Sequence, residues 1–503
     1  MPSPDDRATG DGPAAARAFL AGAADWPHPV YLCLRRRGRR LWHDWLVQDQ
    51  RAGLEAAIGR HPGADRAELF LPAGFRPAGD GDLPARWTGI HGIEVRAGDR
   101  VARMAPSHMI AANHTFARAL ARCRAVLDGA AGEVRRIVGH TVVLPLAGDR
   151  QPVAWHRAGP PAAALAPAAL AHALGGWLVA NTGADGRLTY KYWPSRGRES
   201  AADNTVRQFM GTLALGRYAR WSGRADAADA WQRNLDRQID TYYAALPDGA
   251  GMIAHGGTAK LGAAAIAALA LLEAPATPRR MRALDGLIAG IERLWRADGS
   301  FRTFHVPAGR NDNQNFYPGE ACLFWAHLHA RRRDGAVLAR LLASLDHYRD
   351  WHRRQRNPAF VPWHVQAHAA LYTATGMTGR IGFVFEMTDW LLPLQQWDTA
   401  PADDMRGRFY DPARPHFGPP HAASTGAYME GLAAAATLAR AVGESQRPPA
   451  TPAPSPGRCA TSSSSHSSTT RIFSIFPGVV VCTAGCAPRS TTTPSASTTC
   501  STL

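Results

Sequence analysis

Apolar helices with polar beginnings recur along the middle of the chain. Each begins with small and polar residues and continues as a helix too apolar to face water, and the beginnings lie near Asp203, His255, Asn311, Pro362 and Ala422. Amphipathic stretches alternate with them and predict further helices at residues 225–246, 278–296, 334–353 and 378–394. The beginnings recur about every fifty residues, which indicates stacked helical hairpins.

The stretch 311–331 shows this design most clearly. An amide-rich loop, 311–315, leads into an aromatic-Pro-Gly turn at 316–319, and Glu320 then falls in the first helical turn. Proline at a helix start and an acid in the first turn are both favourable. Two segments that follow helices, 184–194 and 297–307, share Asp-Gly, alternating residues, an aromatic and a proline, so each is predicted to be a short extended piece.

Residues 25–157 have a different pattern and are predicted to form a separate α+β accessory domain. Residues 31–47 indicate a strand, an Arg/Gly turn and a second strand, and residues 67–75, 89–106 and 134–146 indicate further strands. Residues 113–127 are amphipathic and are predicted to be helical. Residues 1–24 are expected to be disordered. The Ala/Pro-rich stretch 158–170 is expected to be a linker that merges into the first helix of a helical domain at 163–445.

The tail, residues 446–503, differs from the rest in composition. It has no Asp, Glu or Lys, it is rich in Pro, Ser and Thr, and it holds four of the chain's seven cysteines. One interpretation is a disordered, low-complexity segment. The sharper hypothesis is translation out of frame, because a GC-rich back-translation shifted by one nucleotide restores acidic residues and a segment like residues 203–208. That segment falls where a sixth inner helix is due, so the helical domain of this chain is expected to be incomplete.

Composition changes this picture little. The net charge is +16, but apart from Lys191 and Lys260 the basic residues are arginines spread along the chain, with no nucleic-acid recognition motif. We therefore expect a GC-rich coding bias and no nucleic-acid partner. No apolar run approaches the ~20 residues of a membrane span, and the N-terminus lacks the apolar core of a signal peptide. A cytoplasmic protein is expected, with free core thiols and no disulfide framework.

The helical pattern resembles the six-hairpin (α/α)₆ toroid superfamily of glycosidases, sugar epimerases and polysaccharide lyases. The motifs that carry this resemblance are DNTVRQ (203–208), GGTAKLG (256–262), NFYPGEA (315–321) and AYMEGL (427–432). NFYPGEA is most similar to the D-glucuronyl C5-epimerase and acylglucosamine epimerase-like branch. Residues 89–106 resemble, more weakly, the AMMECR-type domain, although that family's Arg-Gly-Cys-Ile-Gly stretch is absent. The expected fold class is a small α+β domain, then an all-α (α/α)₆-type toroid, incomplete, and a disordered tail.

In such a toroid the loops that enter the inner helices converge on one end of the barrel. Free N–H groups and the positive ends of helix dipoles also point there, which favours anionic or hydroxyl-rich ligands. Aromatic, amide and acidic side chains pooled at that end match what a sugar ring needs. The candidate catalytic residues are Glu320, Tyr317, His364 and Glu430. The candidate substrate-binding residues are Asn204, Arg207, Lys260, Asn315, Trp363, His368 and Tyr428.

Each candidate also has a structural interpretation. Glu320 is the best acid or base candidate, but an acid in a first turn also serves as a helix cap. His364 and His368 share one helix face and could form a core pair or a substrate contact, and without a third ligand no metal site is expected. Arg207, one turn after Asp203, is either a helix-end ion pair or a clamp on a carboxylate.

The expected function is a carbohydrate-active enzyme of glycoside hydrolase, uronate or sugar epimerase, or lyase type, without a cofactor, acting on a saccharide or uronate. Two carboxylates would support glycoside hydrolysis. A Tyr or His base near an arginine would instead support proton abstraction beside a uronate carboxylate. Truncation of the last hairpin could leave the chain inactive. The alternative is a non-catalytic toroid that binds a saccharide, a peptide or a partner protein.

Overall fold

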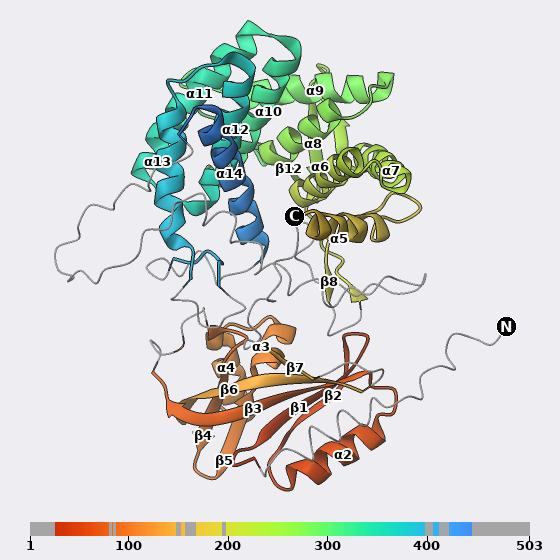
Figure 1. Cartoon of the computed structure of the whole chain (residues 1–503), viewed down its shortest axis with the longest axis vertical. Coiled ribbons are helices and arrows are strands. Elements are labelled where there is room, and N and C mark those ends of the chain that lie inside the picture. The colour runs from red at the N-terminus through yellow and green to blue at the C-terminus, as the bar shows by residue number, and fades with distance from the viewer. Residues whose placement is uncertain are drawn as a thin grey trace, which may run out of the picture.

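A computed structural model describes residues 26–79, 83, 87–146, 152–155, 167–193, 198–397, 406–411 and 422–444. They form a sheet unit before residue 156 and a helical unit after residue 166 (Figure 1). The N-terminal stretch 1–24, most of the linker 158–170 and the tail 446–503, with its proposed frameshift, lie outside the described residues. The predicted domain limits therefore stay predictions.

The sheet unit is built on one antiparallel sheet of seven strands in the order β2-β1-β3-β6-β4-β5, with β7 paired to β6. The strands are β1 (Val30–Arg36), β2 (Arg39–Leu46), β3 (Arg66–Pro77), β4 (Gly92–Ala97), β5 (Arg100–Met104), β6 (Glu133–Pro145) and β7 (Val153–Trp155). The strands predicted at 31–47, 67–75, 89–106 and 134–146 are thereby confirmed, with 89–106 forming a hairpin.

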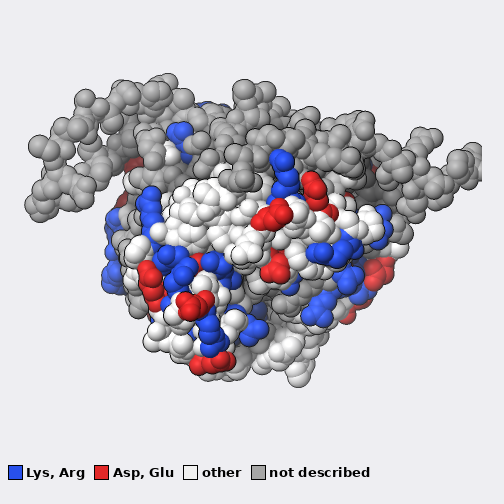
Figure 2. Space-filling view, turned by 90° about the horizontal axis from the view of Figure 1, so that it is seen from below, with Lys and Arg blue, Asp and Glu red and all other residues white. Residues whose placement is uncertain are grey.

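Three helices cover this sheet: α2 (Gln50–Arg60), α3 (Pro106–Ala112) and α4 (Phe116–Val126). Leu54 and Ala57 of α2 pack on buried residues of β1, β3 and β6, whereas α3 and α4 pack on β4 and β5. The helix predicted at 113–127 is confirmed as α4. On the side of the molecule occupied by the sheet unit, Figure 2 shows basic and acidic side chains interspersed around an area without charged residues.

The helical unit has two layers. The inner helices are α6 (Thr205–Ser222), α8 (Leu261–Glu273), α10 (Tyr317–Arg332), α12 (Val361–Thr375) and α14 (Ala422–Ala441), and each packs on the next along the chain. The outer helices are α5 (Pro167–Ala180), α7 (Ala225–Tyr242), α9 (Pro278–Leu294), α11 (Gly335–Arg354) and α13 (Ile381–Leu391). The short 3₁₀ turns η5 (Pro358–Phe360) and η6 (Leu392–Leu394) flank α12 and α13.

Burial follows the hydrophobic pattern that predicted these layers. Every residue of α8 from Leu261 to Leu271 is buried, because this helix has protein on all sides. The outer helix α9 buries one stripe that includes Ala283, Leu287 and Ile291, as an amphipathic helix does. Both layers of predicted helices are confirmed. Within the described residues, no helix has the length and apolarity needed to cross a bilayer.

The expectation of an all-α toroid is wrong in part, because strands lie between the helices. A four-stranded sheet has the order β10-β11-β12-β13, from β10 (Tyr243–Ala245), β11 (Gly251–His255), β12 (Thr258–Lys260) and β13 (Phe304–Val306). A small hairpin joins β8 (Tyr192–Trp193) and β9 (Arg198–Glu199). Gly256 and Gly257, with φ of 54° and 72°, make the two-residue turn between β11 and β12. The extended pieces predicted at 184–194 and 297–307 contain β8 and β13.

Candidate functional site

Glu320 lies in the first turn of α10, with only 2% of its surface exposed. Its Oε2 atom has no hydrogen-bond partner, and burial raises the pKa of the carboxyl to about 8. A methyl group at Gly262 would overlap both this oxygen and the ring of Tyr317, so the two side chains lie against the first turn of α8. At neutral pH Glu320 is therefore mostly protonated, as a general acid must be.

Basic and aromatic groups gather near Tyr317. The Arg310 guanidinium lies 4.3 Å from the ring centroid of Phe304, and Phe304 lies 5.9 Å from the ring of Tyr317. Burial raises the pKa of Tyr317 to about 12, helped by the charges of Glu320 and Asp312. Burial also lowers the pKa of Lys260, the residue just before α8, and Arg310 adds to this effect. Lys260 and Tyr317 thus lie in one region around Phe304 and Arg310, with Glu320 beside Tyr317, and the roles predicted for the three residues stay predictions.

Asn204 and Arg207 lie at the beginning of the neighbouring inner helix, α6. Asn204 caps this helix, because its side-chain oxygen accepts a hydrogen bond from the backbone N–H of Arg207 at 3.4 Å. The preceding residue, Asp203, accepts hydrogen bonds from the amide of Gln208 at 2.9 Å and from the hydroxyl of Tyr242. Asn204 therefore has a structural role that does not depend on any ligand.

A polar cavity of about 280 Å³ lies beside Asp203. Its lining includes charged and aromatic side chains from four segments: Arg187, Tyr190, Asp203, Arg237, Tyr242 and His255. The rings of Tyr242 and His255 are 5.4 Å apart, edge to face. Sequence reasoning placed Asp203 and His255 at the mouth but missed the other four. Two features of the sequence could have identified these four residues. The segment 184–194 is polar and aromatic, and the end of α7 lies beside the beginning of α6 because the two helices form a hairpin.

Trp363, His364 and His368 lie on α12 and are all buried. The ring of His364 stacks on Phe360 at 3.7 Å between centroids, and His368 meets Phe383 of α13 edge to face at 5.7 Å. Neither ring nitrogen of either histidine has a hydrogen-bond partner. Burial lowers the pKa of both imidazoles, to about 3 for His368. These histidines thus pack among aromatic side chains, including one from an outer helix, and their roles in catalysis or binding stay predictions.

The last candidates are more dispersed. Asn315 is half-buried in the loop before α10. Tyr428 of α14 packs edge to face on Phe409 at 5.2 Å, and burial raises the pKa of its hydroxyl to about 12. Glu430 is solvent-exposed by surface area, yet the protein atoms around it raise the pKa of its carboxyl, with Arg217 of α6 opposing. The roles predicted for these residues are not tested by their placement.

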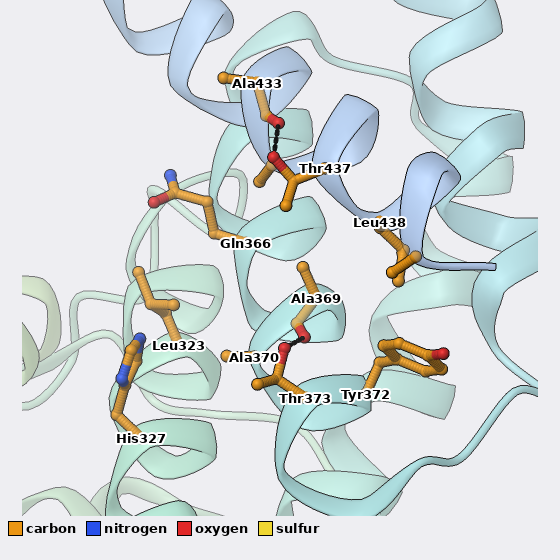
Figure 3. Close-up of a pocket in the computed structure, with 12 residues that line it drawn as sticks. Leu323, His327, Gln366, Ala369, Ala370, Tyr372, Thr373, Ala433, Thr437 and Leu438 are labelled. Atoms are coloured by element: carbon orange, nitrogen blue, oxygen red, sulfur yellow. Dashed lines mark hydrogen bonds between the residues drawn. The ribbon is translucent and has the colours of Figure 1, made fainter. Parts of the chain in front are cut away.

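A larger cavity, of about 420 Å³, lies between α10, α12 and α14 (Figure 3). It contains none of the predicted site residues. Figure 3 shows the hydroxyls of Thr373 and Thr437 turned to their own helices, where they donate to the carbonyls of Ala369 and Ala433. His327, Gln366 and Tyr372 supply the other polar side chains of the lining, which contains no carboxyl group. In the part of the chain that the structure describes, no cluster of three or more His, Cys, Asp or Glu side chains could hold a metal ion.

No family model and no curated protein matches the chain. Among solved structures, it is similar to a GH76 alpha-mannanase of Bacteroides thetaiotaomicron, with TM-score 0.38, 11% identity, and coverage of 55% of this chain and 87% of that one. The Lin0763 protein of Listeria innocua gives TM-score 0.37 and 12% identity, over 48% and 74% of the two chains. A family 76 glycoside hydrolase from a bovine Bacteroides thetaiotaomicron strain gives 0.33 and 8%, over 74% and 96%. Likeness at this level says nothing about the activity of this chain.

Proposed function

We propose that the helical unit is a carbohydrate-active enzyme in which Glu320 is the general acid. The observation that carries this proposal is the buried carboxyl of Glu320, whose Oε2 has no partner and whose pKa is raised to about 8. An unpaired buried carboxyl costs stability, and such groups concentrate where function requires them. Its place at the polar mouth of α10, beside Tyr317, is the arrangement expected for proton transfer to a sugar oxygen or carbon.

The neighbours of Glu320 fit three reactions on saccharides. Asp312 is an ionised carboxylate near the same mouth, because Arg310 holds its pKa below the usual value, and a second carboxylate is what glycoside hydrolysis needs. Lys260, with its lowered pKa, is a candidate base for abstracting a proton beside a uronate carboxylate. Arg310 would neutralise that carboxylate. The products distinguish hydrolysis, epimerisation and β-elimination.

The test is turnover by the full chain on a panel of neutral and uronate-containing oligosaccharides. New reducing ends report hydrolysis, unsaturated uronates report elimination, and deuterium uptake from D₂O at the sugar carbon reports epimerisation. We expect Glu320→Gln to lower kcat/KM by about 10²–10⁴-fold, the usual contribution of a general acid. The control is Glu386→Gln on α13, which changes a glutamate paired with Arg353 on the outer layer and should leave turnover unchanged.

Two results would contradict the proposal. Turnover that survives in Glu320→Gln would remove Glu320 from the reaction. Glycan binding by the parent without any product would instead favour the alternative function, a non-catalytic toroid that binds a saccharide. The measurement of binding and of turnover on the same panel therefore decides between the two functions.

A further inference from the structure

We propose that the cavity between the beginning of α6 and the end of α7 binds a hexuronate, a sugar ring that carries a carboxylate. The inference deepens the proposed function, on which it rests for the saccharide class. The cavity has about 280 Å³ of space, enough for roughly one sugar ring, and it lies at the mouth end of the inner helices. Three features of its lining point to a uronate: two guanidinium groups, an anchored carboxylate and aromatic rings.

The two guanidinium groups belong to Arg187, in the segment before β8, and Arg237, on α7. Arg187 meets Glu199 at 2.7 Å, and Arg237 meets Asp185 at 3.1 Å, in pairs that are largely exposed. Exposed ion pairs contribute little to stability, because water already solvates and screens both charges. Each guanidinium can therefore turn a planar donor edge to a ligand carboxylate, which it would bind through two parallel hydrogen bonds.

Asp203 forms another part of the lining. Its Oδ1 accepts from the backbone N–H of Asn204 at 2.7 Å and from Gln208 at 2.9 Å, and its Oδ2 accepts from the Tyr242 hydroxyl. Gln208 is itself held by Gln238 of α7 at 2.9 Å. This network fixes the position of the carboxylate, whose remaining lone pairs can accept hydrogen bonds from sugar hydroxyls. A ligand carboxylate would be repelled here, so the cavity orients a uronate with its acid towards the arginines.

Aromatic rings complete the site. Tyr190, Tyr242 and His255 reach the cavity from three different segments, and they offer flat apolar surfaces with polar edges. Sugar rings present C–H groups on one face, and such faces pack on aromatic rings. A neutral sugar would use these rings and Asp203 but would leave both arginines with water. The lining therefore favours a uronate over the neutral sugar of the same ring shape.

The experiment measures binding of D-glucuronate and D-glucose to the full chain, by ligand-observed NMR titration. These two sugars differ only in the carboxylate. We expect glucuronate to bind about tenfold more tightly, as one charge-assisted contact allows. The double variant Arg187→Gln/Arg237→Gln should abolish this preference. The control is Arg233→Gln, one turn earlier on the same helix, which removes an exposed arginine outside the cavity and should keep the preference.

The outcomes separate this inference from the proposed function. Equal affinity for the two sugars, or an unchanged preference in the double arginine variant, overturns the uronate site. Glu320→Gln should retain glucuronate binding while losing turnover. If no turnover is found but binding depends on the arginines, the site stands and the proposed activity fails. If turnover is confined to neutral glycans and the double arginine variant matches the parent, the activity stands and the site fails.

Discussion

Glu320 shows at the scale of one residue how position and environment combine. The sequence placed it correctly in the first turn of a buried helix beside Tyr317. The space that its unpartnered oxygen occupies, in contrast, lies against Gly262 of α8, a residue distant in sequence. The histidines of α12 show the same limit. Their spacing predicts a shared helix face, but which neighbours that face meets is decided by the packing of α11 and α13.

The first prediction concerns the stability of Glu320→Gln as pH changes. Burial raises the folded-state pKa of this carboxyl from 4.5 to about 8. Below pH 4.5 both states are protonated, whereas between 4.5 and 8 only the unfolded chain loses the proton, so the folded state loses relative stability as pH rises. Denaturant unfolding should show the variant equal to the parent near pH 4. By pH 8 it should be more stable by up to a few kcal/mol, at ~1.4 kcal/mol per pKa unit.

Glu386→Gln serves as the control for that experiment, because its effect on folding stability should have the opposite dependence on pH. Arg353 lowers the pKa of Glu386, so its carboxylate stabilises the folded state above its ordinary pKa, and this contribution is lost as pH falls. The effect should be small because the pair is partly exposed to solvent. A stability difference for Glu320→Gln that does not grow between pH 4 and 8 would show that Glu320 is ionised in the folded protein.

At the scale of elements, strong hydrophobic patterns predicted the helices correctly, whereas elements with weak patterns were missed. The inner helices appeared where long apolar stretches follow polar residues, because burial on all sides demands such a composition. The helix α2 was missed because it buries little besides Leu54 and Ala57 and so lacks a clear apolar stripe. The hairpin of β11 and β12 was missed as well, although Gly256-Gly257 is a known two-residue turn signal.

Close packing of α9 on β11 leads to the second prediction. A methyl group at Gly290 would overlap the carbonyl oxygen of Gly251, and backbone cannot move as a flexible side chain does. Gly290→Ala should therefore destabilise the helical unit by about 1–3 kcal/mol, despite the better helix propensity of alanine. The matched control is Gly176→Ala in α5, which has open space around it and should be neutral or slightly stabilising. Thermal melting that ranks the two variants in the reverse order would contradict this packing.

At the scale of the whole molecule, the inner helices run from α6 to α14, and α14 packs mainly on α12 and α13. This is the order expected of successive helical hairpins, which the spacing in the sequence indicated. Whether a sixth hairpin belongs to the protein depends on residues outside those described, so sequencing the coding DNA across the tail is the appropriate test. The net charge of the whole chain is +16, so each further proton that the folded protein binds increases the repulsion between its positive charges and lowers its stability.

Acid sensitivity is the prediction that follows from this charge and from the buried histidines. Burial lowers the pKa of His352 to about 4 and of His368 to about 3. Between pH 6.5 and 4 the unfolded chain binds protons that the folded chain does not, so stability should fall as pH falls through this range. Around His368, Arg380 and Arg349 strengthen the effect and Asp346 opposes it.

His368→Leu tests this explanation by denaturant unfolding between pH 7 and 4. Removing one such histidine should make the loss of stability shallower by up to ~1.4 kcal/mol per pH unit, because one fewer proton is bound on unfolding. His347→Leu, which replaces a partly exposed histidine on α11, is the control for the loss of an imidazole away from the α12–α13 contact. Parallel profiles for the parent and His368→Leu would mean that His368 is already protonated in the folded protein at pH 4. In that case the packing of α12 against α13 would have to admit water or a charged partner at this imidazole.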